Sequence, residues 1–187
     1  MMEVIEWILQ YLQYIWDIVV YRRWLLWLVA LGIGMYSCRL YGNGKITAIQ
    51  CLCSILTSVY AAVILIVTVL SRTTLQNYQL SVIPFWSYLK MFTGDIRYTK
   101  QIVANILFFI PLGMTAAGIW KKHRIRNTAF LGTGISVIAE SLQLVLKRGF
   151  AEPDDIFDNM LGAVIGALLI AVFCRVKAYR KHNEPAE

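Results

Sequence analysis

Acidic residues crowd a short stretch near the carboxyl-terminal end of the chain. The segment AEPDDIFDNMLGAVIG, residues 151–166, contains four of them, which are Glu152, Asp154, Asp155 and Asp158. Carboxylates together with a substrate phosphate are the usual ligands of Mg²⁺, and a buried carboxyl group can act as a general acid or base. These residue types predict either a metal-assisted reaction or a polar binding site.

A further carboxylate belongs to a polar stripe in the preceding apolar segment, 128–146. The stripe consists of Thr133, Ser136, Glu140, Gln143 and Lys147, which recur at steps of three and four residues. Residues at this spacing share one face of a helix. An ionisable side chain inside a membrane span costs about 2.5–3.5 kcal/mol on insertion scales. The face that carries Glu140 is therefore predicted to point into a helical bundle.

The composition indicates a membrane protein. Of the 187 residues, 58% are hydrophobic and only 16% are charged, and the mean hydropathy is +0.59. Soluble domains are usually closer to half apolar. The net charge of +7 arises mainly from basic residues beside apolar runs, where they orient spans and meet anionic headgroups. The predicted partner is therefore the lipid bilayer, and no nucleic-acid partner is expected.

Five apolar segments are long enough to cross a bilayer, which takes about 20 residues in a helix. They are residues 24–41, 46–71, 102–120, 128–146 and 157–174. A helix satisfies its own backbone hydrogen bonds in lipid. The predicted fold is therefore all-α, a polytopic transmembrane helical bundle of about five spans.

Residues 2–21 form another apolar segment, of a different kind. Glu6, Gln10, Gln13 and Asp17 draw one polar stripe along it. This pattern predicts an N-terminal amphipathic helix that lies at the membrane interface or packs on the bundle. The alternative, a sixth crossing, would have to bury the stripe.

The connection between the second and third spans is too polar to cross the membrane. Within it, SVIPFWSYLKMF (81–92) combines Pro84 with Phe85, Trp86 and Tyr88. Aromatic residues of this kind favour the membrane–water boundary. The segment is therefore predicted to be a partly embedded interfacial loop.

Basic residues predict the orientation. The run KKHRIR (121–126) and the tail RVKAYRK (175–181) fall on the same face of a five-span bundle. By the positive-inside rule this face is cytoplasmic. The C-terminus is then cytoplasmic, and the acidic face points outward.

An alternating topology brings the ends of the second and fourth spans to the starts of the third and fifth. The residues predicted to bind a ligand on this face are Arg72, Pro84, Phe85, Arg97, Asn105, Ser136, Glu140, Gln143, Arg148, Asp155 and Asn159. Packing alone does not require so many polar side chains at one depth on three helices. The conjunction therefore favours a binding site.

Plainer roles remain open for several of these residues. Asp154 and Asp155 could cap a helix N-terminus, and Glu140 could form a structural ion pair with an arginine. Arg72 and Arg148 could be headgroup anchors. Purely structural roles, a kink and close helix packing, are predicted for Pro111, Gly113, Gly162 and Gly166.

Three blocks, in order, resemble the VanZ-like family of bacterial integral membrane proteins, which is associated with teicoplanin resistance. They are SRT (71–73) with the Pro84-Phe85 step, NILFFIPLG (105–113) and SVIAESLQLVLKRGFAEPDDIFDNMLGAVIG (136–166). The last block matches the family's pattern at Ser136, Glu140, Gln143, Arg148, Asp154, Asp155, Asn159, Gly162 and Gly166. It departs from that pattern at Glu152-Pro153, where the family tends to have Asp-Ile, and at Asp158, where the family is often aliphatic.

The resemblance implies a helical membrane fold and a setting in the bacterial cell envelope. It divides the chain into a lineage-specific segment (1–69), a VanZ-like domain (70–172) and a basic cytoplasmic tail (173–187).

Three functions fit these observations. The leading interpretation is an envelope protein that binds an amphiphilic ligand in an outward-facing polar pocket and could lower glycopeptide susceptibility. The ligand would be a peptidoglycan precursor, a lipid headgroup or a lipoglycopeptide. One alternative is an intramembrane hydrolase or transferase acting on a polyprenyl-phosphate or lipid headgroup, with Glu140, Asp154 and Asp155 as catalytic candidates or Mg²⁺ ligands. The other is a small transporter, which the absence of a visible inverted repeat disfavours.

Overall fold

The computed structural model describes residues 10, 23–72, 76 and 83–183. Its elements, in chain order, are α2 (Arg23–Gly42), α3 (Ala48–Leu65), the π-helical turn η1 (Ile66–Leu70), α4 (Trp86–Phe92), α5 (Ile96–Ala117), α6 (Arg124–Val145) and α7 (Pro153–Asn183). No strand occurs among these residues. The predicted all-α class is therefore confirmed.

Four helices in the described part of the chain are long and apolar enough to cross a membrane. They are Ala48–Leu70, Ile96–Ala117, Arg124–Val145 and Pro153–Arg180. The first combines α3 with η1, and each of the four overlaps a predicted span. The chain is therefore a multi-pass membrane protein built as a helical bundle.

Two helices begin earlier than the spans predicted at 102 and 157. α5 begins at Ile96 because Asp95 caps it, accepting a hydrogen bond from the backbone N–H of Arg97. α7 begins at Pro153, and proline suits a first turn because it lacks an N–H that the helix would leave unpaired. Spans predicted from hydropathy alone leave out these polar first turns, although the turns carry several of the acids and amides described below.

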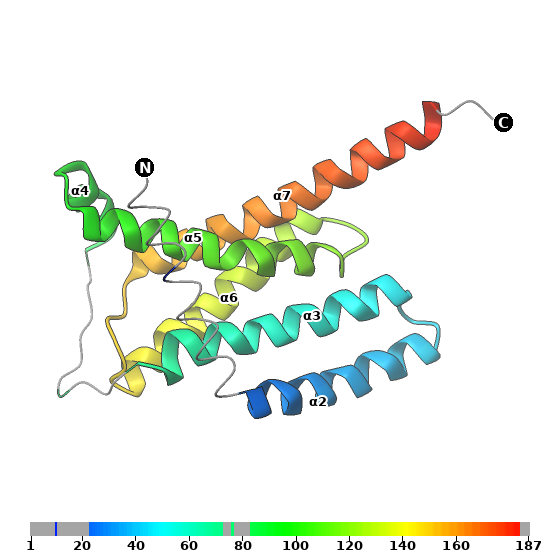
Figure 1. Cartoon of the computed structure of the whole chain (residues 1–187), viewed down its shortest axis with the longest axis horizontal. Helices are drawn as coiled ribbons and strands as arrows, with labels where there is room; N and C mark the ends of the chain where they lie inside the picture. Colours follow the sequence, from blue (N-terminus) through cyan, green and yellow to red (C-terminus); the bar gives the residue numbers. More distant parts are fainter. Residues whose placement is uncertain (1–9, 11–22, 73–75, 77–82, 184–187) are drawn as a thin grey trace.

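The N-terminal part of the chain is described only in part. The predicted first span, 24–41, forms α2, which packs along α3 (Figure 1). α2 is not one of the four helices above, and its membrane crossing stays a prediction. The amphipathic helix predicted at 2–21 lies outside the described residues, apart from Gln10.

α5 and α7 form the most extensive helix pair among the described elements, and they lie side by side in Figure 1. Glycines permit this approach. A Cβ added at Gly162 would lie 2.2 Å from the carbonyl oxygen of Ile106, and Gly166 and Gly113 have equally little space. The two backbones therefore meet directly, as they do at small-residue interfaces in membranes.

The apolar core lies between α3, η1 and α5. It is built from Val63, Ile64, Ile66, Val67, Phe108, Phe109 and Leu112. Beside it, the hydroxyl of Tyr60 on α3 donates to the carbonyl oxygen of Phe108 on α5 at 3.0 Å. This bond lies one turn before Pro111, whose ring removes a backbone hydrogen bond from the helix interior. Core packing and the Tyr60 hydrogen bond therefore hold α3 against α5 close to the turn that lacks a backbone hydrogen bond.

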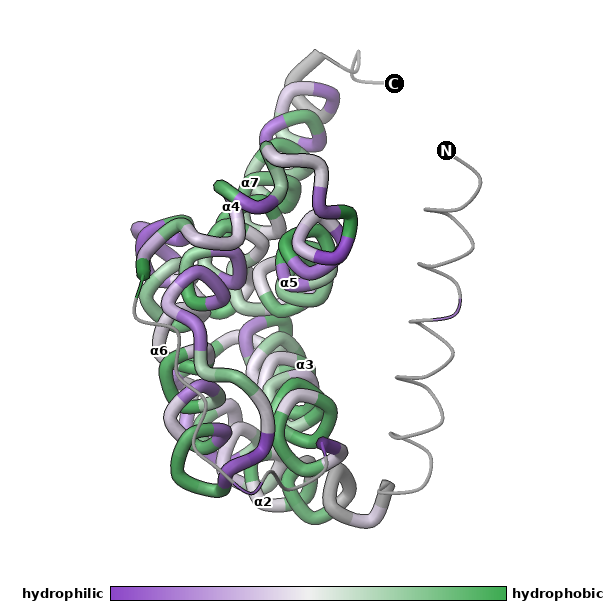
Figure 2. Tube along the Cα trace, turned by 90° about the vertical axis from the view of Figure 1, so that its left-hand side faces the viewer, coloured by the Kyte–Doolittle hydropathy of each residue, from purple (hydrophilic) through white to green (hydrophobic). Residues whose placement is uncertain are grey.

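Polar residues gather at one end of the bundle. Here η1 and α6 end, and α5 and α7 begin, as the alternating topology predicts (Figure 1). Figure 2 looks onto this end and shows hydrophilic residues among its turns and loops, with apolar residues along the helices. We call it the carboxylate end, after its acids Glu140, Glu152, Asp154, Asp155 and Asp158.

The opposite end carries the basic run 121–126, which extends from the loop after α5 into the first turn of α6. There, Gln50 Nε2 donates to the carbonyl oxygen of Ile119 at 2.7 Å, which ties the start of α3 to the end of α5. Arg124 Nε donates to the carbonyl oxygen of Trp120 at 2.9 Å. The acids of the carboxylate end and the basic run of this end lie at opposite ends of the bundle. That the basic end faces the cytoplasm stays a prediction.

Candidate functional site

Asp155, in the first turn of α7, is held by two amides from α5. Its Oδ1 atom accepts hydrogen bonds from Asn105 Nδ2 at 2.7 Å and from Gln101 Nε2 at 3.0 Å. Gln101 also donates to the carboxylate of Glu152. One face of α5 supplies both amides, because residues four apart lie on the same side of a helix. Asn105 is one of the predicted site residues and Gln101 is not, although the four-residue spacing places both on the same face of α5.

Glu140 lies inside the bundle on α6, with 8% of its surface exposed. Its Oε2 atom accepts the backbone N–H of Glu152 at 3.1 Å. The Asp155 carboxylate and the Arg72 guanidinium both lie close enough to interact electrostatically with it. The structure therefore brings together three predicted site residues from α6, α7 and the turn that follows η1.

Arg72 lies against the loop between α6 and α7. Gly149 in this loop has a φ of +108°, and a Cβ there would lie 2.4 Å from Nη1 of Arg72. Glycine adopts such a φ without the steric cost that other residues incur, so Gly149 both turns the loop and leaves room for the guanidinium. The Arg72 side chain is exposed, and within the described residues it forms no ion pair.

The π-helical turn η1 follows α3 in the chain and accepts hydrogen bonds from residues at the end of α6 and just beyond it. A π-turn is wider than an α-turn and often occurs at functional sites. Its Thr68 carbonyl oxygen accepts from Gln143 Nε2 at 3.1 Å. The Leu70 carbonyl oxygen accepts from Arg148 Nη1 at 2.9 Å. Two predicted ligand-binding residues, Gln143 and Arg148, are thus engaged with backbone carbonyls of η1.

Ser136 and Asn159 join α6 to α7. Asn159 Nδ2 donates to Ser136 Oγ at 2.8 Å, and both side chains are buried. A buried amide or hydroxyl is costly without a partner, so this bond stabilises the helix contact. Both residues were predicted to bind a ligand, and in the structure each has the other as its partner.

Asp154 caps α4. Its carboxylate accepts the backbone N–H groups of Phe85 at 2.6 Å and Ser87 at 2.9 Å. The first N–H groups of a helix have no partner within that helix, and Phe85 is held in the left-handed region with a φ of +60°. The capping alternative for Asp154 is therefore realised, but at the N-terminus of α4 instead of that of α7.

Asp158, one turn after Asp154, holds the same short helix. The hydroxyl of Tyr88 on α4 donates to Asp158 Oδ1. The Tyr88 ring also packs edge-on against Phe85 and Phe157, with centroid separations of 6.0 and 6.3 Å. Two carboxylates of α7 and an aromatic cluster therefore attach α4 to the carboxylate end. The part played by Tyr88 had no sequence signal beyond its aromatic neighbours.

The pKa of Tyr88 is raised, first by burial and next by its hydrogen bond to Asp158. A tyrosine with a raised folded-state pKa stabilises the fold below its unfolded pKa of about 10 and loses this contribution as the pH rises further. We expect the stability difference between wild type and Tyr88→Phe to be largest near neutral pH and to shrink above about pH 10. Unfolding midpoints of both proteins in detergent across this range provide the measurement. A difference that does not change with pH would contradict it.

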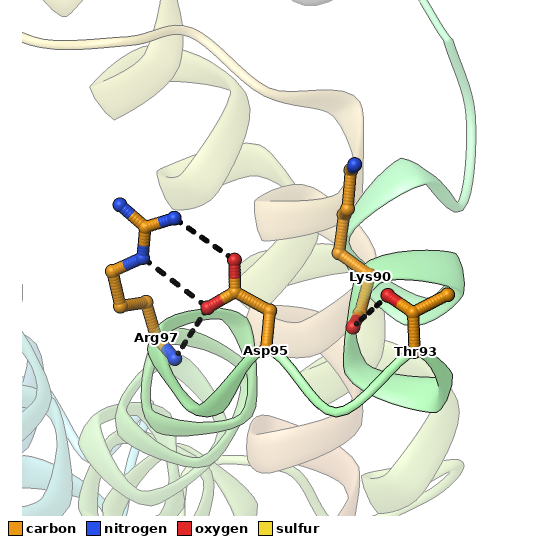
Figure 3. A network of polar contacts seen from close by, with 4 residues as sticks. All are labelled: Lys90, Thr93, Asp95 and Arg97. Carbon is orange, nitrogen blue, oxygen red and sulfur yellow. Dashed lines mark hydrogen bonds and ion pairs between the residues drawn. The ribbon is translucent and has the colours of Figure 1, made fainter.

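Arg97 pairs with Asp95 at the start of α5 (Figure 3). Arg97 Nη2 lies 3.0 Å from Asp95 Oδ2, and the Arg97 side chain is 84% exposed. Hydrogen bonds from the Arg97 side chain and backbone hold the pKa of Asp95 below its ordinary value. Arg97 takes no part in the contacts of Glu140 and Asp155 described above. Pro84 is exposed beside Phe85.

Under the hydrolase or transferase alternative, Glu140, Asp154 and Asp155 are candidate Mg²⁺ ligands. Within the described residues, no three His, Cys, Asp or Glu side chains are grouped so as to hold a metal ion. Both oxygens of Asp154 accept from the start of α4, whereas Glu140 accepts from the backbone of Glu152. A Mg²⁺ site stays part of that alternative, and both oxygens of Asp154 are already engaged as the cap of α4.

Comparison with known proteins agrees with this architecture. Residues 51–174, about two thirds of the chain, match the VanZ/LLP1 family. The match begins within α3, before the start of the resemblance described from residue 70, and it contains the whole carboxylate end. No curated protein and no solved structure matches the chain. A family match of this extent, together with four apolar helices of spanning length, shows that the chain is a membrane protein belonging to the VanZ/LLP1 family.

Proposed function

We propose that this protein binds the headgroup of an amphiphilic molecule of the bacterial cell envelope at the carboxylate end of its bundle. The candidate ligands are a peptidoglycan precursor, a lipid headgroup and a lipoglycopeptide. By holding such a molecule, the protein would lower the susceptibility of the cell to glycopeptides such as teicoplanin. The proposal includes the outward orientation of the carboxylate end, which the basic residues of the opposite end favour.

The observation that carries this proposal is the meeting of an exposed cation with buried carboxylates. Arg72 lies within electrostatic range of Glu140 and Asp155, yet it is an exposed residue and in the described part of the chain pairs with neither of them. Guanidinium groups bind phosphate and carboxylate groups through strong, paired hydrogen bonds. A headgroup could place its anionic group on Arg72 and its donor groups toward Glu140.

The charge balance favours a headgroup that brings donors as well as an anion. The Asp155 carboxylate opposes a negative charge on Glu140, and Glu152 adds a further negative charge beside both. Arg148, another basic side chain of this region, already donates to the backbone of Leu70. A purely anionic headgroup would meet repulsion behind Arg72. A zwitterionic or hydroxyl-rich headgroup would instead donate hydrogen bonds to these carboxylates. This is the class of headgroup that we propose.

The test compares Arg72→Ala and Glu140→Gln with the control Arg126→Ala, an exposed arginine at the opposite end of the bundle. Each protein is purified from its host membrane, and co-purifying molecules are identified by native mass spectrometry. Wild type and Arg126→Ala are expected to retain the same headgroup class. Arg72→Ala should retain at least about tenfold less of this headgroup, because a charge-assisted hydrogen bond contributes about 1.5–3 kcal/mol. Glycopeptide susceptibility of cells expressing each variant should follow the reverse order, so that cells with Arg72→Ala are more susceptible than cells with wild type or Arg126→Ala.

Two outcomes would overturn the proposal. In the first, wild type carries no envelope molecule, and Arg72→Ala leaves glycopeptide susceptibility unchanged at equal expression. In the second, the purified protein converts added polyprenyl-phosphate lipids into products, and the hydrolase or transferase alternative then replaces a binding function.

A further inference from the structure

We infer from the structure that α4 docks into lipid at the carboxylate end, with an apolar stripe inserted among the acyl chains of the adjoining leaflet. The stripe, called the α4 stripe below, consists of Phe85, Leu89 and Phe92. The partner is the bilayer itself, at the boundary between headgroups and acyl chains. This inference does not depend on headgroup binding at Arg72.

The α4 stripe is a continuous apolar face. Phe85 and Leu89 are both more than half exposed, and Phe92 is 81% exposed. The three residues are four and three positions apart, so they lie on one side of α4 and its N-terminal turn. Large apolar side chains exposed together on one face indicate contact with a membrane or a protein.

The other faces of α4 are already in use. One is bonded to α7, because the Ser87 N–H donates to Asp154 and the Tyr88 hydroxyl donates to Asp158. On another, Lys90 Nζ lies 4.6 Å from the ring centroid of Trp86. Tryptophan and lysine with an apolar stem are typical of the headgroup level. α4 therefore has the faces expected of an interfacial helix: one face contacts α7, one suits the headgroup level and one is apolar.

The position of α4 argues for lipid as the occupant of the α4 stripe. With seven residues, α4 spans only about 10 Å and cannot cross a bilayer. A turn at Gly94 leads directly into α5, which begins at Ile96 and crosses the membrane. Ile96 and Leu107 on α5 are exposed as well, so the span that directly follows α4 also presents apolar side chains outward. The exposed Asp95–Arg97 pair beside the turn marks the polar boundary (Figure 3).

Docking of α4 would also set the level of the carboxylate end. Asp154 and Asp158 are attached to α4 by the bonds above. A helix held in the leaflet therefore holds these two carboxylates at a constant depth relative to the headgroups.

The first test uses the unmodified chain in phosphatidylcholine nanodiscs that contain a lipid with a diazirine in its acyl chain. Trypsin cuts after Lys90 and Arg97 and releases the peptide MFTGDIR (91–97), which contains Phe92. We expect acyl-chain adducts on this peptide after illumination. If the peptide carries none while peptides from the spans do, the inference is wrong.

The second test resolves the faces of α4 one residue at a time. A nitroxide is attached at Phe92→Cys or, as the matched control, at the exposed neighbour Thr93→Cys, after replacement of Cys38, Cys51, Cys53 and Cys174 by alanine. The label at 92 should collide with oxygen several-fold more than with a water-soluble nickel complex, and the label at 93 should show the reverse. A label at 92 that is open chiefly to nickel would place the α4 stripe in water. A label shielded from both reagents would show a protein partner, such as a second copy of the chain, and either result overturns the inference.

Discussion

Alanine at Gly166 is expected to destabilise the bundle by about 1–3 kcal/mol, the usual cost of overpacking. A Cβ at this position would lie 2.1 Å from the carbonyl oxygen of Ile110 and 2.7 Å from the backbone nitrogen of Met114. Both atoms belong to the backbone of α5, which cannot rotate aside as a flexible side chain can. α5 and α7 must move apart, and this would loosen the contact that brings Asp155 to its amide donors.

The matched control for this prediction is Gly134→Ala on α6. Gly134 is an exposed helical glycine with no atom within 4 Å of an added Cβ, so alanine there should be neutral or gain up to about 1 kcal/mol in helix propensity. Unfolding of both variants by denaturing detergent, followed by circular dichroism, measures the difference. If Gly166→Ala is as stable as Gly134→Ala, the two backbones do not meet as described.

Removing the carboxylate in Asp154→Ala is expected to cost about 2–4 kcal/mol, because two backbone N–H groups at the start of α4 lose their acceptor. One of them, on Ser87, is fully buried. The left-handed turn at Phe85 would also lose the bond that holds it. The expected result is a less stable protein in which α4 separates from α7.

Two measurements check this prediction. The free energy of unfolding should fall for Asp154→Ala, and limited trypsin digestion should cut faster after Lys90 on α4. Asp95→Ala serves as the control, because Asp95 also caps a helix but does so at an exposed position with a single backbone N–H. Asp154→Asn should be intermediate, because an amide oxygen can accept one of the two bonds. Equal stability of Asp154→Ala and Asp95→Ala would contradict the buried cap.

These two predictions also separate folding from binding at the carboxylate end. Gly166 and Asp154 act on the packing of α7, so their variants should lose stability whatever the ligand is. Arg72 is exposed and pairs with no carboxylate within the described residues, so Arg72→Ala should fold normally and lose only the co-purifying molecule. A variant that loses the ligand while it keeps wild-type stability is therefore the informative one.

Hydropathy and residue spacing by themselves determined the membrane class, the helical fold and the end of the bundle at which the polar residues meet. These features follow from free energies that act on each segment separately. An apolar run of sufficient length is most stable as a helix in lipid, and a stripe with three- and four-residue spacing must face inward if it carries Glu140. The glycines 162 and 166 could also be assigned to packing, because their spacing places both on one helix face.

The partner of each polar side chain becomes evident only in the folded chain. Asp154 and Asp155 are neighbours in the sequence, but consecutive residues point in directions about 100° apart around a helix. One therefore reaches α4 and the other reaches Gln101 and Asn105 on α5. The sequence cannot distinguish their roles, because partner choice depends on how helices cross and where loops turn. The same holds for Arg72, which lies over the turn at Gly149, and for Arg97, which pairs with Asp95 instead.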